Sequence, residues 1–74
     1  MNNATTKEKI YSLGRNIYAK RREKNFSQNT LAEKVDISRE HLAKIETAKR
    51  VASLYLLIGI AEELSIKVKD LIDF

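Results

Sequence analysis

The sequence predicts an all-α fold, a five-helix bundle with a helix-turn-helix at its second and third helices. Proline is absent and only two glycines occur among 74 residues, so few residues interrupt helices. Apolar residues recur at three- and four-residue spacings along most of the chain, as in amphipathic helices. Serine directly precedes three of the expected helices, where its hydroxyl can cap the first turn. This length is enough for one domain over residues 1–74 with one core.

The first helix is expected over residues 6–24. Thr5 and Glu8 have the spacing of a capping box, in which each side chain satisfies a backbone donor of the other residue. The apolar stripe that follows comprises Ile10, Leu13 and Ile17. Gly14 lies on this stripe, where it weakens the helix by ~1 kcal/mol relative to alanine but permits another helix to approach closely. We expect residues 1–5 to be frayed.

Two short helices joined by a tight turn are expected next. The second helix covers residues 28–35 and the third ends near Thr47, and Ser27 and Ser38 stand at their N-caps. Asp36 occupies the turn and tolerates the left-handed conformation better than most residues. The residues expected to face the core are Leu31, Ala32, Val35, Ile37, Leu42 and Ile45. This arrangement is a helix-turn-helix.

The C-terminal residues 51–74 are expected to contain two further helices and an exposed apolar patch. Ser53 caps the fourth helix, whose inward residues are expected to be Leu54, Leu57, Ile60, Ala61 and Leu64. The apolar residues Ile66, Val68, Leu71 and Ile72 indicate a short fifth helix. One helix cannot turn all of residues 54–58 toward the same core. We therefore expect an exposed patch, which usually marks an interface, from some of Tyr55, Leu56, Ile58, Ile72 and Phe74. Our candidates for a dimer contact are Leu56, Ile72 and Phe74.

Composition argues against several classes of function. The absence of cysteine excludes disulfides and thiolate metal sites. The chain has one histidine, no glycine-rich phosphate loop and little room for a pocket, so we expect no enzyme activity, cofactor, metal or small-molecule ligand. The longest apolar run is too short to cross a bilayer and no signal-peptide pattern is present, so we expect a cytoplasmic protein without a membrane partner.

Charge is distributed unevenly along the chain. Residues 1–50 contain 12 Lys/Arg and 6 Asp/Glu, a net charge of +6, whereas residues 51–74 contain 2 and 4, a net charge of −2. The basic part could face a polyanion. The alternative is that these lysines and arginines only form a solvated surface.

The joint spacing of residues in 27–46 resembles the Cro/C1-type (XRE) helix-turn-helix family. The matching residues are Ser27-Gln28, Leu31-Ala32, Val35, Ile37-Ser38, Leu42 and Ile45-Glu46, followed by Ser53-Leu54, Leu57, Ile60-Ala61, Leu64, Ile66 and Asp70-Leu71. The resemblance covers residues 13–72 and implies a lambda-repressor-like fold that binds double-stranded DNA. The chain departs from the family pattern where glycine, glycine, proline and serine are usual, at Asp36, Ala48, Ala52 and Lys67.

The third helix would present the residues that read DNA bases. The first residues of the second motif helix reach base edges in the major groove. The predicted base-reading residues are Arg39, Glu40, Ala43 and Lys44. Arg39 could pair with guanine and Glu40 with a cytosine amino group. The alternatives are a solvated face with an ordinary Glu40–Lys44 pair, and a His41 that points either toward DNA or back across the motif.

Contacts to the DNA backbone are expected around the two helix N-termini and after the third helix. The predicted residues are Ser27, Gln28, Asn29, Ser38, Lys49 and Arg50. Each serine could equally be a cap only. The family resemblance implies that Gln28 supports the reading residue. It also implies that Arg21 and Glu46 form a partly buried structural ion pair.

The function that follows is a transcription regulator, a repressor acting as a homodimer on a palindromic operator. Two reading helices in a two-fold dimer would lie about 34 Å apart, one turn of DNA. The alternative is an antitoxin or adaptor module that binds a protein partner through its apolar C-terminal surface. RNA binding is less well supported, since the aromatic residues form no evident stacking platform.

Overall fold

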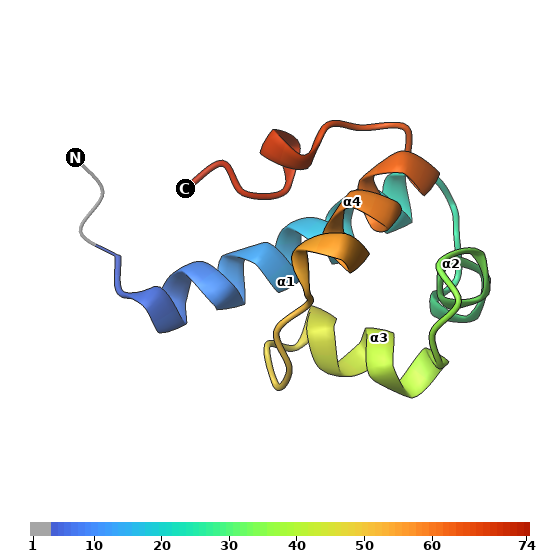
Figure 1. Cartoon of the computed structure of the whole chain (residues 1–74). Helices are drawn as coiled ribbons and strands as arrows, with labels where there is room; N and C mark the ends of the chain where they lie inside the picture. Colours follow the sequence, from blue (N-terminus) through green and yellow to red (C-terminus); the bar gives the residue numbers. More distant parts are fainter. Residues whose placement is uncertain (1–3) are drawn as a thin grey trace.

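The computed structural model describes residues 4–74, and within them all regular structure is helical. The elements are α1 (Thr6–Glu23), α2 (Gln28–Lys34), α3 (Arg39–Glu46), α4 (Leu54–Glu63) and a single 3₁₀ turn, η1 (Val68–Asp70). The three shorter α-helices gather around the C-terminal half of α1, and the C-terminal segment passes back alongside it (Figure 1). The prediction of an all-α fold with a helix-turn-helix at α2 and α3 is confirmed.

Each of the four helices begins with a side-chain cap. The hydroxyls of Thr5, Ser27, Ser38 and Ser53 accept hydrogen bonds from the backbone N–H three residues on, at 2.9–3.1 Å. At Thr5 the capping box is complete, because the Glu8 carboxylate accepts from the Thr5 N–H at 2.9 Å. That hydrogen bond lowers the pKa of Glu8. Thr5 is therefore held in place, whereas the expected fraying of residues 1–3 lies outside the described residues.

All four helices end at a residue in the left-handed conformation that is not glycine. Asn25, Asp36, Ala48 and Ser65 have φ between 58° and 61°. After each, the next backbone N–H returns to a carbonyl five residues earlier, at 2.8–3.1 Å, which is the hydrogen bond of a Schellman motif. The departures from family glycines at Asp36 and Ala48 therefore keep the backbone geometry that glycine favours. An alanine has no polar side chain to offset this strain.

Replacing Ala48 with glycine is expected to raise the free energy of unfolding by about 0.5–1 kcal/mol. Glycine adopts φ near 61° without a Cβ clash, and this gain is reduced by the greater freedom of glycine in the unfolded chain. Urea denaturation monitored by circular dichroism measures the change. Ala19→Gly, at an exposed position inside α1, is the matched control and should lower stability by about 1 kcal/mol. Equal losses in the two variants would contradict the strain at Ala48.

The core receives at least one fully buried side chain from every α-helix. These residues are Ile17, Leu31, Leu42, Ile60, Leu64 and Leu71, the last two lying just after α4 and η1. Two expectations for α4 were wrong: Leu54, expected inside, is 66% exposed, and Leu56, expected in the exposed patch, is 8% exposed. Leu56 shares the buried face of α4 with Leu57 and Ile60, whereas Leu54 lies in the first turn beyond the edge of that face.

The fifth helix is replaced by one 3₁₀ turn. The chain leaves α4 through the left-handed residue Ser65, and the few residues that follow close only one turn, in which Leu71 N donates to Val68 O at 2.8 Å. The Leu71 carbonyl then accepts from the Asn16 side chain at 2.8 Å instead of a following helical N–H. A short segment cannot nucleate an α-helix alone, and here burial of Leu71 and the bond to α1 decide its shape. Residues 4–74 therefore form four α-helices and not five.

Candidate nucleic-acid interface

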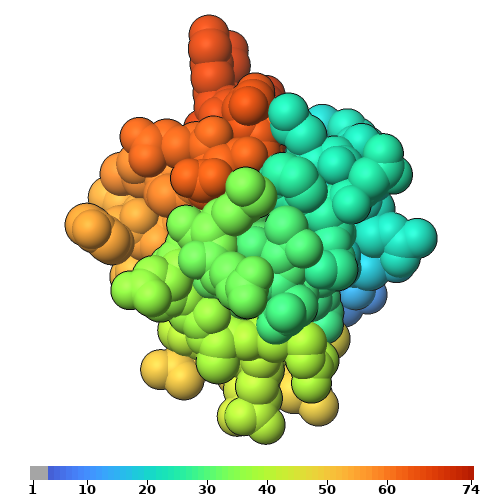
Figure 2. All heavy atoms as spheres, turned by 90° about the vertical axis from the view of Figure 1, so that its right-hand side faces the viewer, coloured from blue at the N-terminus to red at the C-terminus, as the bar shows by residue number. Residues whose placement is uncertain are grey.

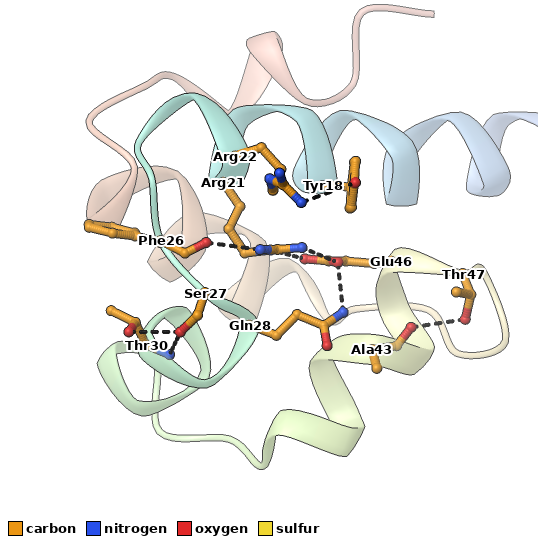
Figure 3. Close-up of polar contacts among 10 residues, drawn as sticks. All are labelled: Tyr18, Arg21, Arg22, Phe26, Ser27, Gln28, Thr30, Ala43, Glu46 and Thr47. Carbon is orange, nitrogen blue, oxygen red and sulfur yellow. Dashed lines mark hydrogen bonds and ion pairs between the residues drawn. The ribbon is translucent and has the colours of Figure 1, made fainter.

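A buried ion pair joins α1 to the end of α3. Arg21 Nε donates to Glu46 Oε2 at 2.7 Å and Arg21 Nη2 donates to Glu46 Oε1 at 3.0 Å, a bidentate arrangement (Figure 3). The Arg21 side chain is 5% exposed and that of Glu46 2% exposed, so the pair expected to be partly buried is almost completely buried. Arg21 Nη1 also donates to the carbonyl of Phe26 at 2.8 Å, just before α2.

Gln28 completes this network from α2. Its Nε2 donates to Glu46 Oε1 at 3.0 Å, so the Glu46 carboxylate is bound from both α1 and α2 (Figure 3). Gln28 thus binds the last residue of α3, and among residues 4–74 it forms no hydrogen bond with Arg39. Because an isolated buried carboxylate is unfavourable, the three side chains have to keep these relative positions. The network therefore sets the position of α3 against α1 and the N-terminus of α2.

The face of α3 that is predicted to read bases is open to solvent. Arg39, Glu40 and Lys44 are exposed, and Ala43 is partly buried between them. Within residues 4–74 Glu40 and Lys44 do not form an ion pair with each other. His41 is partly buried and lines a cavity between the α2–α3 turn and α4. Figure 2 shows α2 and α3 adjoining on one face of the molecule.

The residues predicted to contact the DNA backbone lie around this face. The Ser27 and Ser38 hydroxyls act as caps, and Ser27 Oγ also donates to Thr30 Oγ1 at 2.9 Å. Asn29 is exposed in the first turn of α2. Lys49 and Arg50 are exposed in the turn after α3, where both backbone N–H groups bind the carbonyl of Lys44, at 2.8 and 3.2 Å. Gln28 binds the Glu46 carboxylate, whereas the other predicted backbone contacts have no carboxylate partner among the described residues.

Sequence analysis did not single out a basic and aromatic cluster on α1. The guanidinium carbons of Arg15, Arg21 and Arg22 lie 4.3, 5.2 and 5.8 Å from the centre of the Tyr18 ring. The spacing of Arg15, Tyr18 and Arg22 places them on one helical face, and this pattern could have been found in the sequence. The proximity of this cluster to the buried ion pair could not have been found in the sequence.

The exposed apolar residues form the other notable part of the surface. Ile72 and Phe74, two of the three candidates for a dimer contact, are exposed, whereas the third, Leu56, is buried. On α4 and just before it, the exposed side chains are Val51, Leu54, Tyr55 and Ile58. Tyr55 is 91% exposed. Tyr55 and Ile58 are therefore exposed as expected, and Val51 and Leu54 are exposed in addition.

Residues 4–74 contain neither a cluster of metal ligands nor a membrane-spanning helix. No group of three or more His, Cys, Asp or Glu side chains there is arranged to hold a metal ion. None of the helices in this part of the chain combines the length and the apolar character needed to span a membrane.

Comparison with known proteins identifies the family. A family model described as helix-turn-helix matches residues 17–71, whereas no curated protein matches the chain. The restriction-modification controller protein C.AhdI from Aeromonas hydrophila has a similar structure, with a TM-score of 0.83 and 26% identity over 86% of this chain and 97% of that one. The clp gene regulator ClgR from Corynebacterium glutamicum has a TM-score of 0.83 and 25% identity over 85% of this chain and 67% of that one.

A third similar structure is the master regulator for biofilm formation SinR, which was solved in complex with DNA. It has a TM-score of 0.75 and 30% identity, over 80% of this chain and 95% of that one. The region that the family model matches, residues 17–71, contains α2, α3 and α4 entirely, together with the buried Arg21–Glu46 pair. The chain belongs to the Cro/C1-type (XRE) helix-turn-helix family of DNA-binding transcription regulators.

Proposed function

We propose that the protein is a sequence-specific repressor that binds double-stranded DNA as a homodimer and places α3 in the major groove. The observation that carries this proposal is the buried network of Arg21, Glu46 and Gln28, which holds α3 so that its polar face stays free. A reading helix has to be held rigidly, because an imprecise position would lose the directional hydrogen bonds to base edges. The DNA complex of the similar regulator SinR supports the assignment of DNA as partner.

The proposal gives each predicted DNA contact of the motif a role. Arg39 pairs with a guanine, Glu40 accepts from a cytosine amino group, and Lys44 reaches a base edge or a phosphate. Ala43 lets the helix approach closely. The backbone contacts come from Ser27, Gln28, Asn29, Ser38, Lys49 and Arg50. Gln28 keeps its second amide hydrogen for a phosphate while it binds Glu46.

The homodimer is proposed from the exposed apolar residues. Ile72 and Phe74 near the C-terminus remain candidates, and the exposed side chains Leu54, Tyr55 and Ile58 of α4 join them. Leu54, Tyr55 and Ile58 lie within the first two turns of α4, and a contiguous exposed apolar patch usually marks an interface. A two-fold dimer would present two copies of α3 to successive turns of the major groove, about 34 Å apart, and so select an inverted repeat.

Replacing Arg39 with alanine is expected to weaken binding to the preferred site by about 5- to 150-fold for each half-site that the homodimer occupies. This range corresponds to ~1–3 kcal/mol for the loss of one bidentate contact to a base. Binding sites selected from a randomised duplex library by the wild-type protein should contain an inverted repeat, and those selected by Arg39→Ala should tolerate any base pair at one position of each half-site. Lys69→Ala, which removes an exposed positive charge from η1, is the matched control and should leave the selected sequence unchanged.

Selection of no motif by the wild-type protein would overturn the proposed function. If both proteins bound every duplex weakly and equally, the exposed apolar surface with Tyr55 would favour the alternative, a module that binds a protein partner. Selection of a single half-site without a repeat would retain DNA reading and overturn the homodimer.

A further inference from the structure

The face of α1 next to the buried ion pair carries an unusual concentration of positive charge around one aromatic ring. Three guanidinium groups lie within 5.8 Å of the centre of the Tyr18 ring. Arg22 Nη1 also donates to Tyr18 Oη at 3.4 Å. The ring face attracts cations and so holds the guanidiniums close together. Arg15 and Tyr18 are partly buried and Arg22 is exposed, so the cluster opens to solvent.

Only one of the three charges is neutralised. Arg21 is bound by Glu46, whereas among residues 4–74 neither Arg15 nor Arg22 forms an ion pair with a carboxylate. The nearest acidic residue along α1, Glu23, lies 3.8 Å from Lys20 instead. Two guanidiniums with unused donors therefore lie beside a phenol group whose O–H can also donate. An oxyanion would relieve the repulsion between them and accept hydrogen bonds from all three groups.

The cluster is linked to the residues proposed to bind DNA through the buried pair. Tyr18 and Arg22 lie on the opposite side of the Arg21–Glu46 pair from Gln28 (Figure 3). Glu46 binds Gln28, a proposed phosphate contact at the start of α2, and it also binds Arg21, whose guanidinium lies 5.2 Å from the centre of the Tyr18 ring. Arginine forks match the geometry of phosphate oxygens, and the Tyr18 ring limits the directions in which these forks can point.

We infer that Arg15, Tyr18 and Arg22 form a clamp for a DNA backbone phosphate outside the helix-turn-helix. This inference rests on the proposed function and extends its DNA footprint onto α1. The clamp adds affinity for any duplex and carries no sequence information, since every phosphate presents the same oxygens. The competing explanation is that Tyr18 and its neighbours only support Arg21.

The test is the salt dependence of DNA binding. Affinities of the wild-type protein, Arg15→Gln and Arg22→Gln are measured between 50 and 200 mM salt, on the selected site and on a scrambled duplex. Loss of one phosphate contact should reduce the log–log salt slope by about 0.9 for each protomer bound. In a single-protomer complex with a half-site duplex, the ratio of variant to wild-type Kd should then be ~3.5-fold larger at 50 mM than at 200 mM salt. Tyr18→Phe keeps the ring and should weaken binding less.

Three controls separate the possible outcomes. Lys69→Gln removes one exposed positive charge of η1 that is not part of the cluster, so slopes of Arg15→Gln and Arg22→Gln equal to its slope would overturn the clamp. A lower urea midpoint or an altered base preference, with an unchanged slope, would also overturn it and assign the cluster to the support of Arg21. Failure of the wild-type protein to bind DNA would overturn the proposed function and the clamp together. If the wild-type protein selects its DNA sequence but Arg15→Gln and Arg22→Gln leave the salt slope unchanged, the clamp alone is overturned.

Discussion

Replacing Glu46 with alanine is expected to lower the free energy of unfolding by about 3–5 kcal/mol, because it leaves a buried guanidinium without its counter-ion. Arg21 would retain the hydrogen bond to the Phe26 carbonyl, and Gln28 would lose its partner on α3. Domains of this size have stabilities of about 4–11 kcal/mol, at 0.05–0.15 kcal/mol per residue. The variant should therefore be largely unfolded if the wild-type stability lies near the lower limit.

Urea denaturation of a set of variants tests this prediction. Glu33→Ala removes an exposed carboxylate from α2 and is the matched control, with an expected change within about 0.5 kcal/mol. The double variant Arg21→Met/Glu46→Leu replaces the pair with apolar side chains and should be much more stable than Glu46→Ala, since no charge is left unpaired. A loss in Glu46→Ala no larger than that in Glu33→Ala would show that the pair is not required for the fold.

The double variant also separates the stability of the pair from its role in DNA binding. Its apolar side chains cannot hold the Gln28 amide, so α3 and the N-terminus of α2 lose their shared anchor. We expect a folded protein with weaker and less selective DNA binding. Unchanged selectivity in this variant would contradict the positioning role that carries the proposed function.

Gly14→Ala is expected to destabilise the protein by about 1–3 kcal/mol, although alanine is the better helix former. A Cβ at position 14 would lie 2.6 Å from the carbonyl oxygen of Ile45 and 2.7 Å from that of Glu46. Both are backbone atoms at the end of α3, so they cannot move aside as a flexible side chain would. Relief of the clash requires α1 and α3 to separate, which would also weaken the Arg21–Glu46 pair.

The second glycine provides a control of opposite sign. A Cβ at Gly59 in α4 would meet only Val35 Cγ1, at the ordinary contact distance of 3.9 Å. Gly59→Ala should therefore raise the free energy of unfolding by ~1 kcal/mol through helix propensity alone. Thermal and urea denaturation of both variants measure the difference. Stabilisation of both variants to a similar extent would contradict the close approach of α1 and α3.

Local signals in the sequence predicted most of the secondary structure. The hydroxyls of Thr5 and Ser53 mark helix starts because the first turn has backbone donors that only a nearby acceptor can satisfy. The spacing of Leu31, Leu42 and Ile60 marks the buried faces because a helix repeats every 3.6 residues. These effects act within a few residues of the chain, so they can be read without knowledge of the fold.

The fifth helix and the exposed patch depended on contacts that are distant in sequence. The α1 residue Asn16 donates a hydrogen bond to the carbonyl of Leu71, and the segment expected to be a fifth helix forms only a single 3₁₀ turn. Which of Leu54 and Leu56 is buried depends on the rotation of α4 against the rest of the core. Periodicity gives the relative angles within a helix but not the orientation of the whole helix.

In the candidate site, too, some features depend on local sequence and others on contacts that are distant in sequence. The sequence by itself determined the helix-turn-helix, its caps and the polar residues of α3, because each depends on neighbours within one or two turns. Only the tertiary structure decided that Gln28 binds Glu46 and that the guanidiniums of three arginines, one of them from the buried pair, lie around the Tyr18 ring. Those contacts arise where α1, α2 and α3 meet, and the close approach at Gly14 sets their distances. The physical reason is that local hydrogen bonds define helices, whereas packing and burial of charge define how the helices are placed.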